Sequence, residues 1–298
     1  MSEFKKYQHV EKHDTIETRG IEIGMCYVFP KIDGTNGSIW MSNGEICAGS
    51  RNRELEIESD NAGFYQWVLK QENIIKLFND NPDYILYGEW LVPHTIKTYR
   101  DESWRKFYIF DIMYNDEYLD YETYIKLLEK YNLEYIPAIC KVKNPTTEKL
   151  IELLDKNIYL IKDGMGTGEG IVIKNYDYKN CFGRVTWSKI VKNEFKENHS
   201  KNGMFGIAEI KCKSGIEEKI VEKFITNTLI EKEYSKIILE SGGWSPKFIP
   251  KLLGVVFYCL VKEESWSILK EFNNPIIDFK KLNATTTKKI KELKPDLF

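Results

Sequence analysis

Residues 27–40 read YVFPKIDGTNGSIW: an apolar run leads into Lys31, turns at Asp33 and Gly34, and resumes as an alternating strand. Apolar and aromatic residues on both sides predict that Lys31 ends a buried strand. Gly34 would let the backbone approach a ligand closely. This setting suits a nucleophilic lysine, although a bare Lys-x-Asp-Gly segment is more typical of an ordinary hairpin turn.

A nucleophilic lysine needs help to lose its proton. An ordinary lysine, with a pKa of about 10.4, is neutral in only about one molecule in a thousand at pH 7. Partial burial, a metal ion or neighbouring lysines would favour the neutral amine. The sequence offers such lysines at Lys174, Lys189 and Lys192.

The bulk composition is that of a soluble globular protein of 298 residues, 42% hydrophobic and 30% charged, with a net charge of −2. The longest apolar run, residues 252–261, is about half the length needed to cross a bilayer, and the polar N-terminal segment lacks a signal-peptide core. We therefore expect a cytoplasmic protein without a membrane partner. Six cysteines without Cys-x-x-Cys spacing favour free thiols over a zinc site or disulfides. Because the net charge is small, any nucleic-acid site must be a local patch.

Polar residues stand at the ends of several predicted strands. The strand over 46–50 delivers Arg51, whose planar fork could bind a phosphate, or which could pair with Glu54 or Glu56 at the surface. The strand over 84–90 closes on Gly88 and Glu89. The strand over 106–113 carries Asp111 in an apolar run, and we expect this acid to face a polar cleft because burying an unpaired charge is costly.

Glu169 and Gly170 precede an apolar strand that ends at Lys174. The preceding Gly-Thr-Gly stands before a strand and opens no helix, so neither the dinucleotide nor the Walker fingerprint applies. A further strand over 185–192 supplies Lys189 and Lys192.

Helical periodicity is found at 61–78, 121–131 and 146–160. Beyond about residue 205 the pattern becomes wholly helical. One long helix is predicted over 216–240 with a stop at Gly242, another from 245 to about 273, and a helical tail over 276–282 and 286–293. A domain boundary is therefore expected near residue 200.

In order along the chain, these elements resemble the motif series of the lysine-dependent nucleotidyltransferases, the superfamily of DNA ligases, RNA ligases and mRNA capping enzymes. The resemblance rests on Lys31, Arg51, Glu89, the Phe110-Asp111 pair, the Glu169-Gly-x-Val-x-Lys174 run and the two late lysines. Thr35 and Asn36 after the glycine, and the opening FKKY followed by Glu11, are similar to the RNA ligase 2 family of T-even phages.

The resemblance implies an α+β fold. A nucleotidyltransferase domain of antiparallel sheets with flanking helices, ATP-grasp-like, would occupy residues 1–200. A small all-α C-terminal domain would occupy residues 205–298 and bind RNA ends through its lysines. Such binding would weaken steeply with salt, whereas lysines on a solvated packing face would give no such dependence.

The resemblance also implies an ATP-dependent RNA ligase that acts in three steps. Lys31 would attack ATP and release pyrophosphate, AMP would pass to an RNA 5′-phosphate, and the 3′-hydroxyl of the other end would displace AMP. Lys189 and Lys192 would neutralise the α-phosphate and help to keep Lys31 neutral. Glu169 would hold Mg²⁺, which prefers carboxylate and phosphate oxygens.

The remaining roles implied by the resemblance concern nucleotide and RNA binding. Glu89 would bind the ribose, and Phe110 would stack near the adenine. Ile32, Asp111 and Lys174 would line the nucleotide pocket, and Asn36 and Arg51 would contact the reactive phosphate or the RNA ends. RNA repair by a monomer is the expected setting.

Two residues depart from the expected pattern. Pro30 precedes the lysine and has no amide hydrogen, so an adenine contact usually made there must come from elsewhere. Lys189 and Lys192 are separated by two residues where one is expected, so an alternating strand would place them on opposite faces unless it contains a bulge.

Three alternatives remain open from the sequence. An ATP-dependent DNA ligase would share the chemistry but not the substrate. A capping guanylyltransferase would use GTP in place of ATP. A non-catalytic RNA-binding protein could keep the same scaffold, although it would have no need of Lys31.

Overall fold

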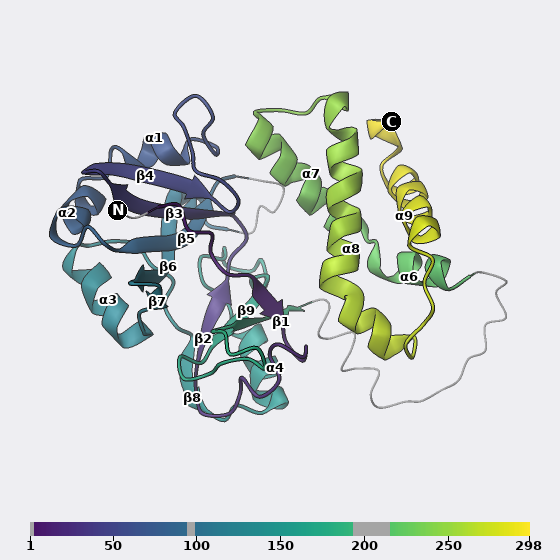
Figure 1. Ribbon diagram of the computed structural model, residues 1–298, viewed down its shortest axis with the longest axis horizontal. Coiled ribbons are helices and arrows are strands. Elements are labelled where there is room, and N and C mark those ends of the chain that lie inside the picture. The colour runs from purple at the N-terminus through teal and green to yellow at the C-terminus, as the bar shows by residue number, and fades with distance from the viewer. Residues whose placement is uncertain (1–2, 94–98, 193–214) are drawn as a thin grey trace. The chain divides into compact units, whose positions relative to one another are not determined.

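The computed structural model describes residues 3–93, 99–192 and 215–298, and the chain forms two compact units, residues 1–203 and 204–298 (Figure 1). The boundary predicted near residue 200 falls in 193–214, outside the described residues. No helix among the described residues is long and apolar enough to cross a membrane.

The first sheet of the first unit carries Lys31 at the end of a central strand. Its strands, in spatial order, are β1 (Val10–Lys12), β10 (Trp187–Val191), β9 (Gly170–Lys174), β2 (Met25–Lys31) and β8 (Cys140–Lys143). All neighbours are antiparallel except β1 and β10, which run parallel. The continuous apolar run of β2 fits a strand that is covered on both faces.

The second sheet is antiparallel throughout. Its spatial order is β4 (Glu45–Ser50), β3 (Thr35–Ser42), β5 (Ile85–Leu91), β6 (Lys106–Tyr114) and β7 (Glu117–Tyr118). The pairing of β5 with β6 shifts at Tyr87 and Gly88, and Phe110 is the extra residue of this bulge. A bulge redirects side chains, and here it falls in the strand where the sequence predicts an adenine contact.

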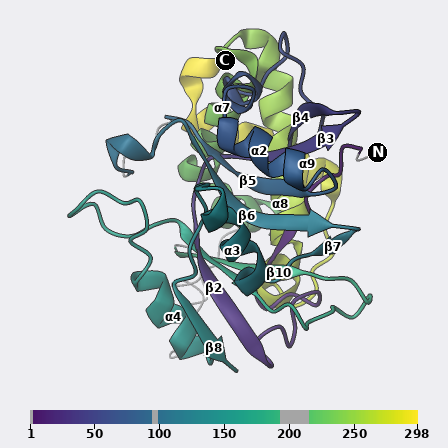
Figure 2. The ribbon, with the colours of Figure 1, turned by 90° about the vertical axis from the view of Figure 1, so that its left-hand side faces the viewer.

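Among the described residues, four α-helices flank these sheets. They are α1 (Phe64–Val68), α2 (Glu72–Asp80), α3 (Tyr121–Lys130) and α4 (Thr147–Asp155). α1 and α3 contact the second sheet, while α4 contacts β9 of the first (Figures 1 and 2). Asp120 and Thr146 cap α3 and α4 by accepting from main-chain amides, as their residue types favour. α4 is shorter than the helix predicted over 146–160, because the chain turns back toward β9 after Lys156.

The two faces of the first sheet have different neighbours. Val28, Ile171 and Ile190 share a core with leucines of α4. On the opposite face, Trp187 packs with Trp40 and Tyr87 of the second sheet. Phe29 is opposite Val172, which packs against this second core, and residues two apart along a strand share a face, so Lys31 lies on the second face with Phe29, between the two sheets.

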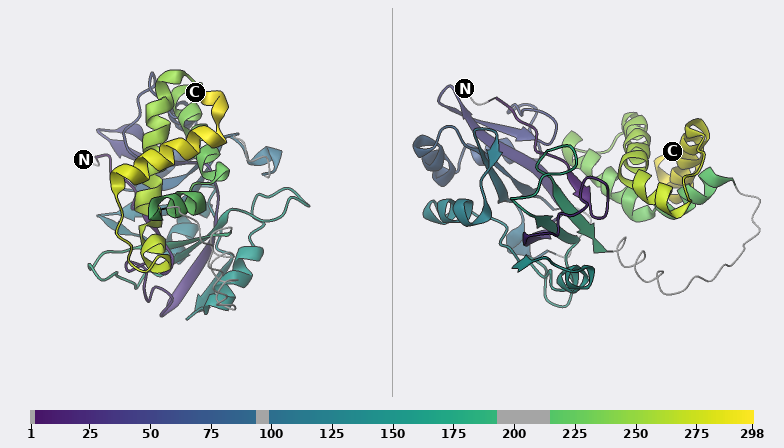
Figure 3. Two further views of the ribbon diagram at one scale, coloured as in Figure 1. Left: turned by 90° about the vertical axis from the view of Figure 1, so that its right-hand side faces the viewer. Right: turned by 60° about the horizontal axis from the view of Figure 1, so that its bottom comes forward.

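The described part of the second unit contains α6 (Ile216–Phe224), α7 (Asn227–Ser241), α8 (Ile249–Glu271) and α9 (Phe279–Leu293). α6, α7 and α9 all contact α8 (Figure 3). The prediction of one helix over 216–240 is wrong. Ile225 is extended, and the Thr226 hydroxyl accepts from Leu229 N to start a new helix.

The predicted stop at Gly242 is confirmed, with a left-handed φ of 71°. The segment predicted to contain two short tail helices forms the single helix α9, which begins after Asp278. Ile276 precedes this helix and is almost fully exposed.

Candidate active site

Lys31 and Glu169 form the centre of the site. β2 pairs with β9 so that Lys31 lies opposite Gly170, and Gly170 is the residue that follows Glu169. Lys31 Nζ donates to Glu169 Oε2 at 2.5 Å. Their side chains are 21% and 16% exposed, so both can be reached from solvent. A reactive amine and a carboxylate are thus held together at the ends of two adjacent strands.

The turn after Lys31 is held by two side chains from other elements. Asp33 N donates to the Tyr99 hydroxyl at 2.8 Å, and Gly34 N donates to Glu89 Oε1 at 2.9 Å. A Cβ at Gly34 would lie 2.6 Å from the carbonyl oxygen of Trp90. Gly34 is therefore required by the close approach of β5, whereas the sequence suggested the approach of a ligand.

Glu89 sits in an environment that favours its protonated form. Burial raises the pKa of Glu89 from 4.5 to about 7, although the charge of Lys31 and the hydrogen bond from Gly34 oppose this shift. Near neutral pH this carboxyl group is therefore poised between its two forms.

We expect Glu89→Gln to be stabilising relative to the wild type at pH 8 and nearly neutral at pH 5. A raised folded-state pKa means that the unfolded chain loses its proton first, so the wild type loses stability as the pH rises from about 4.5 to about 7. Because Glu89 is only partly buried, solvent reduces the free energy that corresponds to its pKa shift. We therefore expect the difference in unfolding free energy between the two proteins at pH 8 to reach about 2 kcal/mol. Chemical denaturation of both proteins at the two pH values measures it, and a pH-independent difference would contradict the assignment.

Asn36 and Arg51 lie on strands next to Glu89. Asn36 is directly opposite Glu89 in the β3–β5 pairing, so their side chains share a face. Arg51 follows β4 and donates from Nη2 to His9 Nδ1 at 3.0 Å. The guanidinium is exposed, as a group that binds a phosphate needs to be.

Asp111 does not face a cleft, and the expectation that it does is wrong. It is fully buried, and its Oδ1 lies 2.8 Å from Lys174 Nζ, which is 2% exposed. Tyr7 and Trp187 donate to its other oxygen at 2.5 and 3.2 Å. Burial raises the pKa of Asp111 and lowers that of Lys174, while their mutual attraction opposes both shifts. The pair links β6 to β9 beneath the site.

Phe110 and Ile32 differ in their access to a ligand. Phe110 is partly buried and packs against Tyr7 with a ring separation of 4.9 Å. Lys174 Nζ donates to the Phe110 carbonyl at 2.6 Å and fixes the bulge. Ile32 is buried in a core cluster with Phe29 and Tyr99, so a nucleotide would meet its main chain and not its side chain.

The two late lysines have different neighbours, and only Lys189 belongs to a strand of the first sheet. Lys189 is opposite Val172, which is in turn opposite Phe29, so Lys189 shares the face of Lys31. Lys192 Nζ donates to Thr167 at 2.5 Å and lies 3.3 Å from Asp155, the last residue of α4. Lys192 follows the last residue of β10, and its contacts with Thr167 and Asp155 separate it from Lys189, so a shared task for the two lysines is not supported.

The structure brings to the site several residues for which the sequence predicted no role there. Tyr99 comes from a segment without a motif, and His9 from the alternating run of His9, Glu11 and His13. Tyr7 belongs to the opening FKKY, so its hydrogen bond to Asp111 gives that segment a structural purpose. Neither the turn contact of Tyr99 nor the Arg51 contact of His9 leaves a pattern in the sequence.

The residues at the site are compatible with Mg²⁺ that enters with a nucleotide. Among the described residues, no group of three or more histidine, cysteine, aspartate or glutamate side chains could hold a metal ion unaided. Mg²⁺ commonly binds through one or two carboxylates together with substrate phosphates and water. The partly exposed carboxylate of Glu169 beside Lys31 fits that role.

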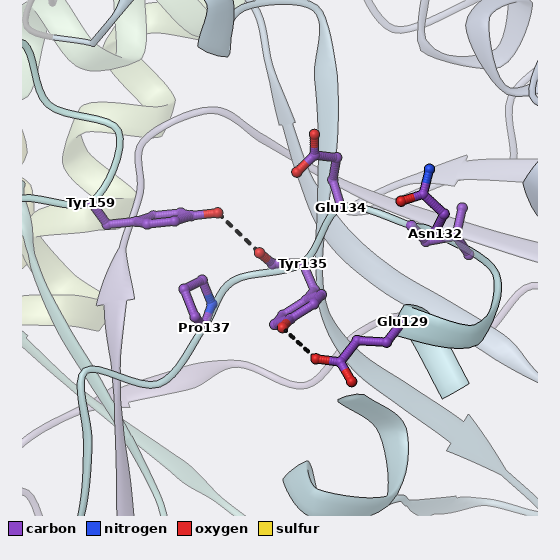
Figure 4. A pocket seen from close by; sticks show the side chains of 7 residues that line it. Glu129, Asn132, Glu134, Tyr135, Pro137 and Tyr159 are labelled. Carbon is purple, nitrogen blue, oxygen red and sulfur yellow. Dashed lines mark hydrogen bonds between the residues drawn. The ribbon is translucent and has the colours of Figure 1, made fainter. Parts of the chain in front are cut away.

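A separate pocket of about 460 Å³ contains none of the predicted site residues (Figure 4). It is lined by Glu129, Asn132, Leu133, Glu134, Tyr135, Pro137 and Tyr159. Tyr159 donates to the Tyr135 carbonyl at 2.9 Å, and the Tyr135 hydroxyl donates to Glu129 at 3.1 Å. Two carboxylates without a cation in the lining would repel a polyphosphate.

A model of the RNA ligase family matches residues 25–191, more than half of the chain. The chain belongs to the RNA ligase family. The matched region of this RNA ligase family member contains Lys31, Glu89, Glu169 and Lys189, while Lys192 lies one residue beyond it. A comparison with curated proteins finds no match.

Solved structures of an RNA ligase from Naegleria gruberi share the fold of this RNA ligase family member. The structure with pyrophosphate is 21% identical with a TM-score of 0.50, and a variant with AMP and Mn is 20% identical with a TM-score of 0.52. A further variant with ATP and Mn is 20% identical with a TM-score of 0.50. Each match covers 66% of this chain and 58% of the Naegleria chain. The matched part is thus less than two thirds of that ligase.

Proposed function

We propose that this protein is an ATP-dependent RNA ligase of the RNA ligase 2 type, which joins 3′-hydroxyl and 5′-phosphate ends through a lysyl-AMP intermediate on Lys31. The observation that carries the proposal is the contact of Lys31 with Glu169 at 2.5 Å, on the face between the two sheets. It lies within the region that matches the RNA ligase family.

In the first step Lys31 Nζ forms a bond to the α-phosphorus of ATP, and the bond to pyrophosphate breaks. Mg²⁺ bound by Glu169 would neutralise charge on the α-phosphate. Glu169 would then interact less strongly with the ammonium form of Lys31, which favours the neutral nucleophile. Lys189, on the same face, would stabilise the negative charge that develops on the phosphate.

In the second and third steps AMP passes to the RNA 5′-phosphate and is then displaced by the 3′-hydroxyl. The exposed Arg51 and the neighbouring Asn36 would hold the phosphate that reacts. Glu89 would bind the ribose with the oxygen that Gly34 does not use, and Phe110 would stack on the adenine.

Three residues receive different roles from those that the resemblance implies. Asp111 and Lys174 would form a buried ion pair that fixes Phe110, since Lys174 donates to its carbonyl oxygen. Lys192 would hold the 167–169 segment against α4, since it contacts Thr167 and Asp155.

We also propose that residues 205–298 help to bind RNA ends. Several lysines of this unit already have glutamate partners. In or just after α9, Lys281 pairs with Glu217 and Glu218, Lys289 with Glu222, and Lys294 with Glu231. A phosphate would have to compete with these carboxylates. The lysine-rich appearance of α9 therefore overstates the positive charge that RNA would meet.

A nicked duplex with ribose or deoxyribose at the 3′-hydroxyl end tests the proposed substrate. We expect sealing of the ribose-ended nick to be at least about tenfold faster, because a site that binds the 2′-hydroxyl is left unsatisfied by deoxyribose. Labelled product is measured over time on denaturing gels. Equal rates would favour a DNA ligase, and RNA binding without sealing of either nick would favour a non-catalytic protein.

A further inference from the structure

Asn157 lies just after α4, where the chain turns back toward β9, and its side chain is 1% exposed. Its Nδ2 donates to the Gly170 carbonyl at 2.6 Å. Its main-chain oxygen accepts from Gly168 N at 2.7 Å. Both bonds go to the residues that flank Glu169. Asn157 therefore holds the chain before Glu169 with its main-chain oxygen and the chain after Glu169 with its side-chain amide.

The fit between Asn157 and Gly168 is close. A Cβ at Gly168 would lie 2.5 Å from Asn157 Nδ2, too near unless the Asn157 amide moves away. On the other side, Lys192 N donates to the main-chain oxygen of Glu169 at 3.0 Å. The backbone from 168 to 170 therefore has little freedom to rotate, and the direction of the Glu169 side chain is set by these contacts.

Asn157 acts here as a hydrogen-bond donor. Its Oδ1 is buried and has no hydrogen-bond partner among the described residues. A buried, unsatisfied oxygen is unfavourable, so the amide is explained by what its nitrogen does. The nitrogen satisfies the Gly170 carbonyl next to Glu169.

We propose that Asn157 is a positioning residue that orients Glu169 and thereby sets how tightly the site binds its divalent cation. This inference rests on the function proposed above. Residues that orient a metal ligand through a hydrogen bond typically change metal affinity by about 10- to 100-fold when they are lost. The hydrogen bonds of Asn157 to this segment go to Gly168 and Gly170 and not to the Lys31 side chain, so its effect on the site would pass through the backbone that carries Glu169.

Asn175 offers a matched control. It is also 1% exposed, and its Nδ2 donates to the main-chain oxygens of Ile21 and Ile23 at 3.0 and 2.8 Å. It follows β9 at the end away from Glu169. Asn175→Ala therefore also removes a buried amide that donates to main-chain oxygens, without touching the Glu169 segment.

The test compares wild type, Asn157→Ala and Asn175→Ala by two measurements. Free Mn²⁺ is followed by electron paramagnetic resonance in the presence of a non-hydrolysable ATP analogue, and labelling by radioactive ATP is followed as Mg²⁺ is increased. For Asn157→Ala we expect Mn²⁺ affinity to fall about tenfold, the half-maximal Mg²⁺ concentration to rise about tenfold, and saturating Mg²⁺ to restore most of the rate. Asn175→Ala should melt at a lower temperature but keep the wild-type metal response.

Unchanged Mn²⁺ affinity in Asn157→Ala, or equal shifts in both variants, would overturn the inference. If Asn157→Ala does not fold, Gly168→Ala provides the second variant, because its Cβ displaces the Asn157 amide and should weaken Mn²⁺ binding in the same way. Failure of the proposed function would look different: the wild type itself would take no label from ATP.

Discussion

In Lys31→Ala, the rate of sealing RNA ends that carry an ordinary 5′-phosphate is expected to fall at least about a thousandfold, because the nucleophile of the first step is removed. The same variant should still join a strand that already carries AMP on its 5′-phosphate. That substrate bypasses the lysine, while Glu169, Lys189 and Arg51 remain in place. The measurement is the sealing rate of both substrates by wild type and variant.

Lys31→Arg serves as a control for charge in this experiment. Arginine keeps a cation beside Glu169, so Lys31→Arg should fold at least as well as Lys31→Ala. The arginine side chain cannot become a neutral nucleophile near pH 7. Both variants should therefore fail with the 5′-phosphate and succeed with the adenylylated strand. Failure of both variants on both substrates, with folding intact, would mean that Lys31 acts throughout and is not specific to the first step.

Lys189→Met and Lys192→Met are expected to differ sharply, although both remove a lysine from the same segment. Lys189 lies on the face of Lys31, so its loss should slow adenylylation at least about a hundredfold through lost stabilisation of phosphate charge. Lys192 is bound to Thr167 and Asp155, so its loss should slow adenylylation less than about tenfold, through looser positioning of Glu169. Single-turnover labelling with ATP measures both rates.

Thermal unfolding of the two variants completes this comparison. Methionine keeps most of the length of the lysine side chain, so neither replacement should prevent folding. A loss in Lys192→Met as large as that in Lys189→Met would mean that Lys192 leaves Asp155 and reaches the phosphate when the nucleotide binds. The separation of roles between the two lysines would then be incorrect.

Strand ends were the most predictable part of the site. Lys31 closes an apolar run and Glu169 opens another, and the structure pairs these strands so that the two side chains meet. Lys189 lies within β10 on the face of Lys31, whereas Lys192 follows the last residue of that strand, so alternation along a strand does not decide where its side chain points. The ends of the apolar strands depend on local patterns, which a sequence displays directly.

Contacts between distant segments could not be predicted in the same way. Asp111 was expected in a cleft because a lone acid in an apolar strand needs a partner, but the sequence does not show that Lys174, Tyr7 and Trp187 supply it in the core. The break between α6 and α7 was missed because apolar periodicity continues across it, whereas the cap at Thr226 depends on a single side-chain hydrogen bond. The role of Asn157 could not be predicted either, because its partner Gly170 is brought next to it only by the turn of the chain after α4.

Covalent labelling of the wild type is the decisive test of Lys31 as the nucleophile. The protein, first shown to carry no nucleotide, is incubated with Mg²⁺ and either ATP or GTP, denatured, digested and examined by mass spectrometry under conditions that preserve a phosphoramidate. The account predicts one adenylyl group on the peptide that contains Lys31, formed from ATP and absent with GTP. An adenylyl group on another lysine, a guanylyl group, or no adduct from either nucleotide would contradict it.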